Sequence, residues 1–565
     1  MRSGTRFAPL YALPLLVAVV LQATADSPFD YVPDEAGAVV YVPSTDAVVA
    51  GINKFGKAIG VDEMATLTSK DVNDNMFTAL EGLDTSKPML FAVGPDGEDS
   101  MVIVCSLKDV DAWKKSGDVA EKDGRFTYTL EGDEWCAMLK GPVLVSARDA
   151  DILADAGKSS GKFGKVFADA IKGLGDDQFL VLVDVEAFRT VIESGLVAAD
   201  AGITVAMEMA ASQAGDEAEM YTAFAKWAMA ALKRLVGDAE RVVVTGRLDG
   251  DGVRIRKQLA FKSGTVTEYL GKVGKIGKPL LRGLPDRPFM AAMAADWKTP
   301  ADTPSISEDL LDVMAVAIKS DAKEKYAAFI AKARKTYRES TGYNAILAST
   351  PDGMSIAGTY FTPDPAAYRK LMIEGQEFAQ GMIGMMNQGP MKMECKVGEE
   401  KLAGKDVTTV EYHFSSDDPD LEKMLTTMYG EKPTMFTADG PEGMVMTFGG
   451  GESARKILAT SLDSSSKWLP GNARVKEAMG RVSPDPQFVA LVDLGEFLAF
   501  ATRMAESMGA GMPEMKLGAP TSLVTASLYL DPKGVRAELW VPADPIKKII
   551  LMATSAMGEE AHPME

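Results

Sequence analysis

The feature that most constrains this chain is internal repetition, because blocks of residues recur in the same order in its two halves. A repeated order of this kind predicts one supersecondary unit that is present twice. Each block is a hairpin, or a combination of turn, helix and strand. The recurring pairs are residues 33–42 with 285–297, 88–115 with 344–370, 152–188 with 457–497, and 246–261 with 527–541.

The repeat sets the expected domain organisation. We expect copy A to cover residues 26–284 and copy B to cover residues 285–552. Residues 553–565 are polar and small, and we expect a flexible C-terminal tail there. We expect residues 1–25 to be a targeting segment that is not part of the fold.

The fold class follows from the turns inside each block. Pro95-Asp96-Gly97 aligns with Pro351-Asp352-Gly353, each between two apolar runs. Asp-Gly between alternating runs predicts an antiparallel hairpin, because glycine adopts the positive φ of a tight turn. Helical patterns lie between the hairpins. The sequence therefore predicts an α+β fold, in which each copy is an antiparallel sheet built from short-turn hairpins with helices mostly on one face.

Two longer helical segments and two strands stand out. Residues 189–237 form a helical insert in copy A, and a helix is expected near 305–340 in copy B. The insert contains an apolar stripe at helical spacing, which predicts a face packed on a core. The runs FLVLVD at 179–184 and FVALVD at 488–493 are apolar on both faces, so we expect them in mid-sheet beneath helices. The stripe consists of Tyr221, Phe224, Ala228, Leu232 and Leu235.

The N-terminus resembles a signal peptide. Arg2 and Arg6 precede an apolar run at residues 7–21, and Ala23-Thr24-Ala25 fits the cleavage rule of small residues. An uncleaved anchor is the alternative. We expect export, with the mature protein in the periplasm or outside the cell. No later run is long and apolar enough for a membrane helix, so we do not expect an integral membrane protein.

The charge limits the kinds of partner. The full chain has a net charge of −20, and removal of a leader that contains Arg2 and Arg6 makes it more negative. Such a chain repels phosphates, so we expect no nucleic-acid partner. A small apolar molecule or another protein remains the expected partner.

Cysteine and histidine are scarce. Cys105 and Cys136 lie in two strand-like runs and are candidates for a cross-strand disulfide, while Cys395 is expected to be a buried thiol. The mature chain contains only His413 and His562, which argues against catalysis or metal binding by histidine. We interpret His413 as a surface residue.

Two patterns could support an enzyme. Ser159 and Lys162, and equivalently Ser464 and Lys467, have the Ser-x-x-Lys spacing of some acyl-transfer enzymes. The polar, glycine-rich surroundings favour a loop and helix cap instead. Asp184 and Asp493 end equivalent apolar strands and precede helices, which predicts helix capping; a carboxylate-based hydrolase is the alternative.

Methionine is unusually abundant, with 33 residues in the chain. A cluster between residues 382 and 395 could pack in the core, line an apolar groove or bind Cu(I) through its sulfur atoms. The weak candidate metal ligands are Met382, Met385, Met386, Met391, Met393 and Cys395.

The sequence contains no catalytic signature and calls for no cofactor. The resulting hypothesis is a non-enzymatic binding or structural module of the cell envelope or extracellular space, which could hold an apolar ligand between sheet and helices. The alternatives are a carboxylate- or Ser-Lys-based hydrolase and a Met-rich Cu(I)-handling protein.

Overall fold

A computed structural model describes most of the chain, which divides into two compact units. The described residues are 27–76, 82–116, 119–130, 132–214, 218–273, 277–298, 313, 323–386, 391–416, 418–463, 467–509 and 521–558. Unit 1 contains residues 1–57, 61–192 and 241–249, and unit 2 contains residues 58–60, 193–240 and 250–565. The expected signal peptide lies outside the described residues.

Unit 1 is an antiparallel sheet with short helices. Its strands are β1 (Ala38–Val42), β2 (Met89–Gly94), β3 (Gly97–Ser106), β4 (Ala120–Lys122), β5 (Arg125–Leu130), β6 (Asp133–Lys140), β7 (Val143–Ala147), β8 (Phe179–Asp184) and most of β9 (Ala239–Asp249). The helical elements are η2 (Pro28–Tyr31), most of α2 (Thr45–Ile59), α3 (Asp62–Ala65), α4 (Ser69–Met76), α5 (Val110–Lys115), α6 (Ala150–Ala156), α7 (Lys162–Val166) and α8 (Ala168–Lys172).

Unit 2 is a larger antiparallel sheet with longer helices. Its strands are β10 (Gly252–Phe261), β11 (Ala291–Asp296), β12 (Gly342–Thr350), β13 (Gly353–Tyr360), β14 (Met391–Leu402), β15 (Lys405–Ser416), β16 (Pro433–Asp439), β17 (Met444–Gly450), β18 (Phe488–Val492), β19 (Val524–Asp531) and β20 (Gly534–Pro542). The helical elements are most of α9 (Arg189–Ala214), α10 (Ala218–Asp238), α11 (Thr265–Lys272), α13 (Lys323–Glu339), α14 (Pro365–Met386), α15 (Pro419–Tyr429), α16 (Gly451–Leu462), η4 (Leu469–Gly471), α17 (Ala473–Gly480), α18 (Leu494–Ser507) and α19 (Ala543–Gly558).

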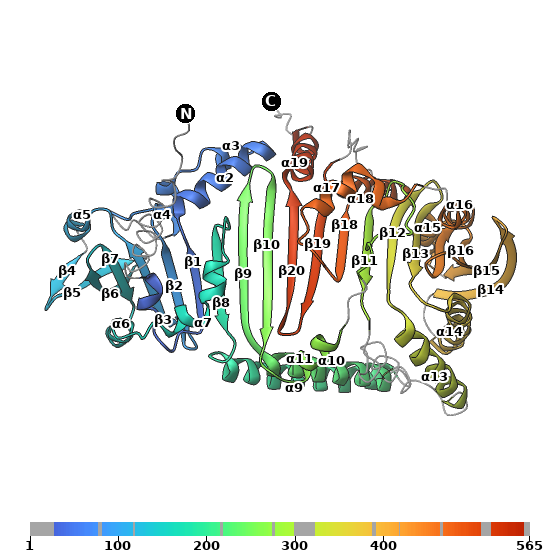
Figure 1. Cartoon of the computed structure of the whole chain (residues 1–565), viewed down its shortest axis with the longest axis horizontal. Coiled ribbons are helices and arrows are strands. Elements are labelled where there is room, and N and C mark those ends of the chain that lie inside the picture. The colour runs from blue at the N-terminus through green and yellow to red at the C-terminus, as the bar shows by residue number, and fades with distance from the viewer. Residues whose placement is uncertain are drawn as a thin grey trace, which may run out of the picture. The chain divides into compact units, whose positions relative to one another are not determined.

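The strands of the two units pair in corresponding orders. In unit 1 the order is β4-β5-β6-β7-β3-β2-β1-β8-β9. In unit 2 it is β14-β15-β16-β17-β13-β12-β11-β18-β19, followed by β20 and β10 (Figure 1). Strand β10 belongs to the first half of the sequence but joins unit 2, where it pairs with β20.

The expected hairpins form where the turn residues predicted them. β2 and β3 flank Pro95-Asp96, and β12 and β13 flank Pro351-Asp352. The α+β class and the antiparallel pairing are therefore confirmed. One helix boundary differs from the expectation, because α19 extends to Gly558, into the expected tail. Of the helix expected near 305–340, the structure describes α13 from Lys323, and the expected start lies outside the described residues.

Part of each sheet is covered on both faces. In unit 1, Leu90 and Val104 pack with Leu153 of α6, whereas their neighbours Met89 and Ile103 pack with Trp113 of α5. In unit 2, α16 packs on one face of β15–β17 and α14 on the other. The expected placement of helices mostly on one face therefore does not hold for these strands.

Candidate functional site

The sheet of unit 2 has an open face between β10 and β12, and the face opposite it is packed from β19 to β12. The packed face is closed by α16 and α17, and its central side chains Val489 and Leu491 have no exposed area. On the opposite face of the same strands, nearly all side chains are partly exposed and apolar. This open face comprises Val253, Ile255, Lys257, Leu259, Val535, Ala537, Leu539, Val541, Val524, Ala526, Leu528, Leu530, Phe488, Ala490, Val492, Ala291, Met293, Ala295, Tyr343, Ala345, Leu347 and Ser349.

The sequence of β19 shows how the open face arises. Successive side chains of a strand point to opposite faces. In VTASLYLD, Thr525, Ser527 and Tyr529 are buried on the packed side, while Ala526 and Leu528 between them are partly exposed. An ordinary half-exposed strand would place polar residues at those positions. Leu539 on neighbouring β20 is 38% exposed.

The open face is closed at one side by helices. Met372 of α14 packs on Val410, Tyr412 and Met435 of β15 and β16, on the side of the sheet away from α16. Burial raises the pKa of Tyr412 to about 12. Arg503 of α18 donates a hydrogen bond to Ser349 at the end of β12. The apolar surface therefore continues from a covered region into a partly exposed one.

Aromatic side chains form the border between these regions. Tyr343 on β12 lies 6.2 Å from Tyr360 on β13, and Tyr360 stacks on Tyr368 of α14 at 5.1 Å, both between ring centroids. Trp297 contacts Tyr343 edge-on at 5.8 Å. Burial raises the pKa values of Tyr360 and Tyr368, so both phenols stay neutral to a higher pH than an exposed tyrosine does.

Unit 1 has a comparable surface. Leu180 and Leu182 of β8 are fully buried, whereas Val181 and Val183 on the other face are partly exposed. Val40 of β1, which is paired with Val181, is 39% exposed. Strand β8 therefore lies in mid-sheet as expected, but its second apolar face is not buried like the first. The same holds for β18 in unit 2.

The two candidate disulfide cysteines are not brought together. Cys105 on β3 points into the cluster around Trp113, while Cys136 on β6 packs against the cluster on the opposite face. Strand β7 lies between β3 and β6, and both thiols are free. Cysteines on opposite faces of a sheet cannot meet the geometry of a disulfide.

The methionine cluster is only partly described. Cys395 on β14 is partly buried beside Tyr412 and forms no disulfide with another described cysteine. The side chains of Met382, Met385, Met386, Met391 and Met393 lie outside the described residues. Across the described part of the chain, no group of three or more His, Cys, Asp or Glu side chains could hold a metal ion.

The candidate Ser-Lys residues have structural contacts. The Ser159 hydroxyl donates to the carbonyl oxygen of Val32 and accepts from the Gly161 N–H at 3.1 Å, which anchors the loop before α7. Ser464 lies outside the described residues. His413 is exposed on β15, as expected.

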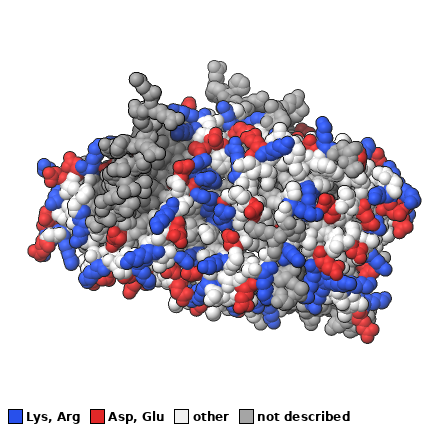
Figure 2. All heavy atoms as spheres, viewed as in Figure 1, with Lys and Arg blue, Asp and Glu red and all other residues white. Residues whose placement is uncertain are grey.

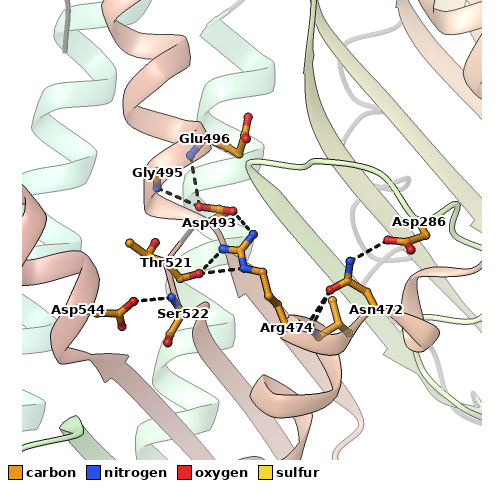
Figure 3. Close-up of polar contacts among 10 residues, drawn as sticks. Asp286, Asn472, Arg474, Asp493, Gly495, Glu496, Thr521, Ser522 and Asp544 are labelled. Atoms are coloured by element: carbon orange, nitrogen blue, oxygen red, sulfur yellow. Dashed lines mark hydrogen bonds and ion pairs between the residues drawn. The ribbon is translucent and has the colours of Figure 1, made fainter. Parts of the chain in front are cut away.

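Asp493 is a helix cap, as its position predicted. Its Oδ1 accepts from the backbone N–H groups of Gly495 and Glu496 at 3.0 and 3.3 Å (Figure 3). Arg474 approaches from α17 and also donates to the carbonyl oxygen of Thr521 (Figure 3). Because the charged groups of Arg474 and Asp493 both have partners within the fold, we interpret this cluster as a structural junction. Asp184 likewise accepts from the Glu186 N–H, at 3.1 Å, in the turn before α9.

Three side chains of the apolar stripe of α10 do not face a core, and the side chain of Tyr221 lies outside the described residues. Phe224 is 50% exposed, and Leu232 and Leu235 are also exposed.

Among the described helices, none is long and apolar enough to cross a membrane. On the face seen in Figure 2, acidic and basic side chains are interspersed.

The open face was not predicted from the sequence. The available signal was the apolar character of both faces of β18, which led us to expect this strand in mid-sheet beneath helices.

No protein-family model and no curated protein matches the sequence. Among solved structures, "Structure of crystal form I of TP0453" is similar at 10% identity over 43% of this chain and 82% of that chain, with a TM-score of 0.23. A likeness at that TM-score supports no inference about fold or function.

Proposed function

We propose that this protein is a non-enzymatic binding module that holds an apolar ligand on the open face of unit 2. The observation that carries the proposal is the contrast between the two faces of β18 and β19. Both faces of β18 are apolar, and on both strands one face is buried while the apolar opposite face is partly exposed. Contiguous exposed apolar surface is costly in water and is typical of binding sites.

The place of action is part of the proposal. Arg2, Arg6, the apolar run at 7–21 and the Ala23-Thr24-Ala25 site support export by a cleaved signal peptide to the periplasm or the outside of the cell. The methionine segment spans the end of α14, the helix that closes one side of the open face, and the start of β14. Flexible methionine side chains near such a surface would adapt to ligands of varied shape.

We further propose that the chain arose by tandem duplication. Each recurring sequence block corresponds to strands at equivalent places in the two pairing orders: β1 with β11, β2–β3 with β12–β13, β8 with β18, and β9–β10 with β19–β20. Duplication would also explain why β1 and β8 carry a comparable partly exposed face.

Native mass spectrometry of the mature protein, purified gently from the producing cells, tests the ligand proposal. We expect a discrete added mass that is lost in Leu539→Glu, because a carboxylate on the open face repels an apolar ligand. Leu551→Glu is the matched control, since Leu551 on α19 is 54% exposed and lies outside the open face. A bare mass that stays bare after incubation with lipid extract would overturn the proposal.

A further inference from the structure

We infer that the ligand of the open face is an amphiphile, with an acyl chain that crosses the strands from β10 to β12 and an anionic head group at Lys257. This inference rests on the proposed function and adds the chemical class of the ligand. It is carried by strand register, side-chain size and charge on one face of the sheet.

The register aligns one row of side chains from β10 to β12. Lys257 is paired with Ala537, Ala537 with Leu528, and Leu528 with Phe488. The row continues through Ala295 to Tyr343. At a strand spacing of about 4.8 Å, six strands give a row of about 24 Å, which suits an extended long acyl chain.

The next row contains a short, shallow furrow on its two central strands. Ala526 on β19 and Ala490 on β18 lie in register, between Leu539 on β20 and Met293 on β11. On β18 the small side chain of Ala490 is flanked by Phe488 and Val492 on the same face. Larger side chains around these two alanines leave space for part of a narrow apolar chain.

The position of charge on the open face indicates where the head group binds. Among the described side chains of the open face, Lys257 is the one that is ionised at neutral pH, and it is exposed at the β10 end of the row. The equivalent position in the second half, from the alignment of Gly252-Val253-Arg254 with Gly534-Val535-Arg536, is Leu539. A lone cation on an apolar surface favours an anion attached to an apolar chain.

The opposite end of the row is suited to the end of the acyl chain. Tyr343 stands at the aromatic border, and its hydroxyl points to Met293 Sδ at 3.9 Å. Together with Tyr360 it presents aromatic surface, which is suited to the end of an apolar chain.

The test compares oleate with oleyl alcohol, which share the chain and differ in charge. Both are titrated into the delipidated full-length mature protein, with Kd measured by isothermal calorimetry at low and high salt. We expect wild type to bind oleate more tightly than the alcohol. Lys257→Gln should weaken oleate binding by about two- to fivefold at low salt, with a smaller loss at high salt, and leave alcohol binding unchanged.

Lys476→Gln, on the exposed side of α17, is the charge-matched control and should behave as wild type. Ala490→Phe should fill the furrow and weaken both ligands together. Equal binding of oleate by wild type and Lys257→Gln would overturn the head-group assignment while leaving an apolar ligand in place. Failure of both compounds to bind wild type would overturn the acyl-chain class, and the native mass spectrum separately decides the proposed function.

Discussion

Arg474 Nη1 lies 2.8 Å from Asp493 Oδ2 and thereby links α17 to the start of α18 (Figure 3). The Asp493 side chain is only 5% exposed, and its other oxygen caps the helix. A buried carboxylate depends on such partners, because desolvation of its charge is otherwise uncompensated.

Replacement of Asp493 by Ala should destabilise unit 2 by about 2–4 kcal/mol, through loss of the cap and of the ion pair. Arg474→Met should cost less, about 1–3 kcal/mol, because the cap remains. Thermal unfolding followed by calorimetry measures both. Asp531→Ala, at the exposed end of β19, is the control. Equal stability of Asp493→Ala and the control would show that the junction is not structural.

The cysteines should differ in reactivity. Burial raises the pKa of the Cys105 thiol to about 12, so its thiolate is scarce even at pH 9, and the side chain is inaccessible. Iodoacetamide should modify Cys136 and Cys395 in the folded protein, faster as pH rises, and reach Cys105 only after unfolding. Peptide mass spectrometry measures the extent of modification at each cysteine. Recovery of a Cys105–Cys136 disulfide from the native protein would contradict the strand arrangement.

Trp113 should be a main stabilising residue of unit 1. It has no exposed area and packs edge-on against Phe126 and Tyr128, at 5.3 and 5.9 Å between ring centroids. Trp113→Ala should lower the free energy of unfolding by about 3–5 kcal/mol, since it leaves a large cavity. Trp113→Phe should cost less. Denaturant unfolding followed by circular dichroism checks both variants, and a loss below about 1 kcal/mol for Trp113→Ala would refute the packing.

Polar replacement of the exposed stripe on α10 should leave stability nearly unchanged. Phe224, Leu232 and Leu235 are exposed, so their replacement by Ser removes little buried area. The lower helix propensity of Ser should destabilise the protein by only about half a kcal/mol per residue. Melting temperature and sedimentation velocity are the measurements. A loss of several kcal/mol, or dissociation of an oligomer, would show that the stripe is covered in solution.

Much of the local structure was predictable. The Asp-Gly turns placed the β2–β3 and β12–β13 hairpins, and Asp493 was correctly predicted to cap a helix. These features depend on residues a few positions apart, which the sequence displays directly. The stripe of α10 was equally visible, yet its exposure was not, because periodicity shows that a face is apolar and does not show what covers it.

The sequence by itself determined the α+β class, the recurring blocks and the turns, because these depend on local backbone preferences and on period-two or helical patterns. The tertiary structure decided three further points: Cys105 and Cys136 point to opposite faces, α14 and α16 cover opposite sides of β15–β17, and one apolar face of β18 and β19 is partly exposed. The physical reason is that strand register and helix docking join residues far apart in the chain. A strand that is apolar on both sides is equally consistent with two packed faces and with one packed face beside a binding surface.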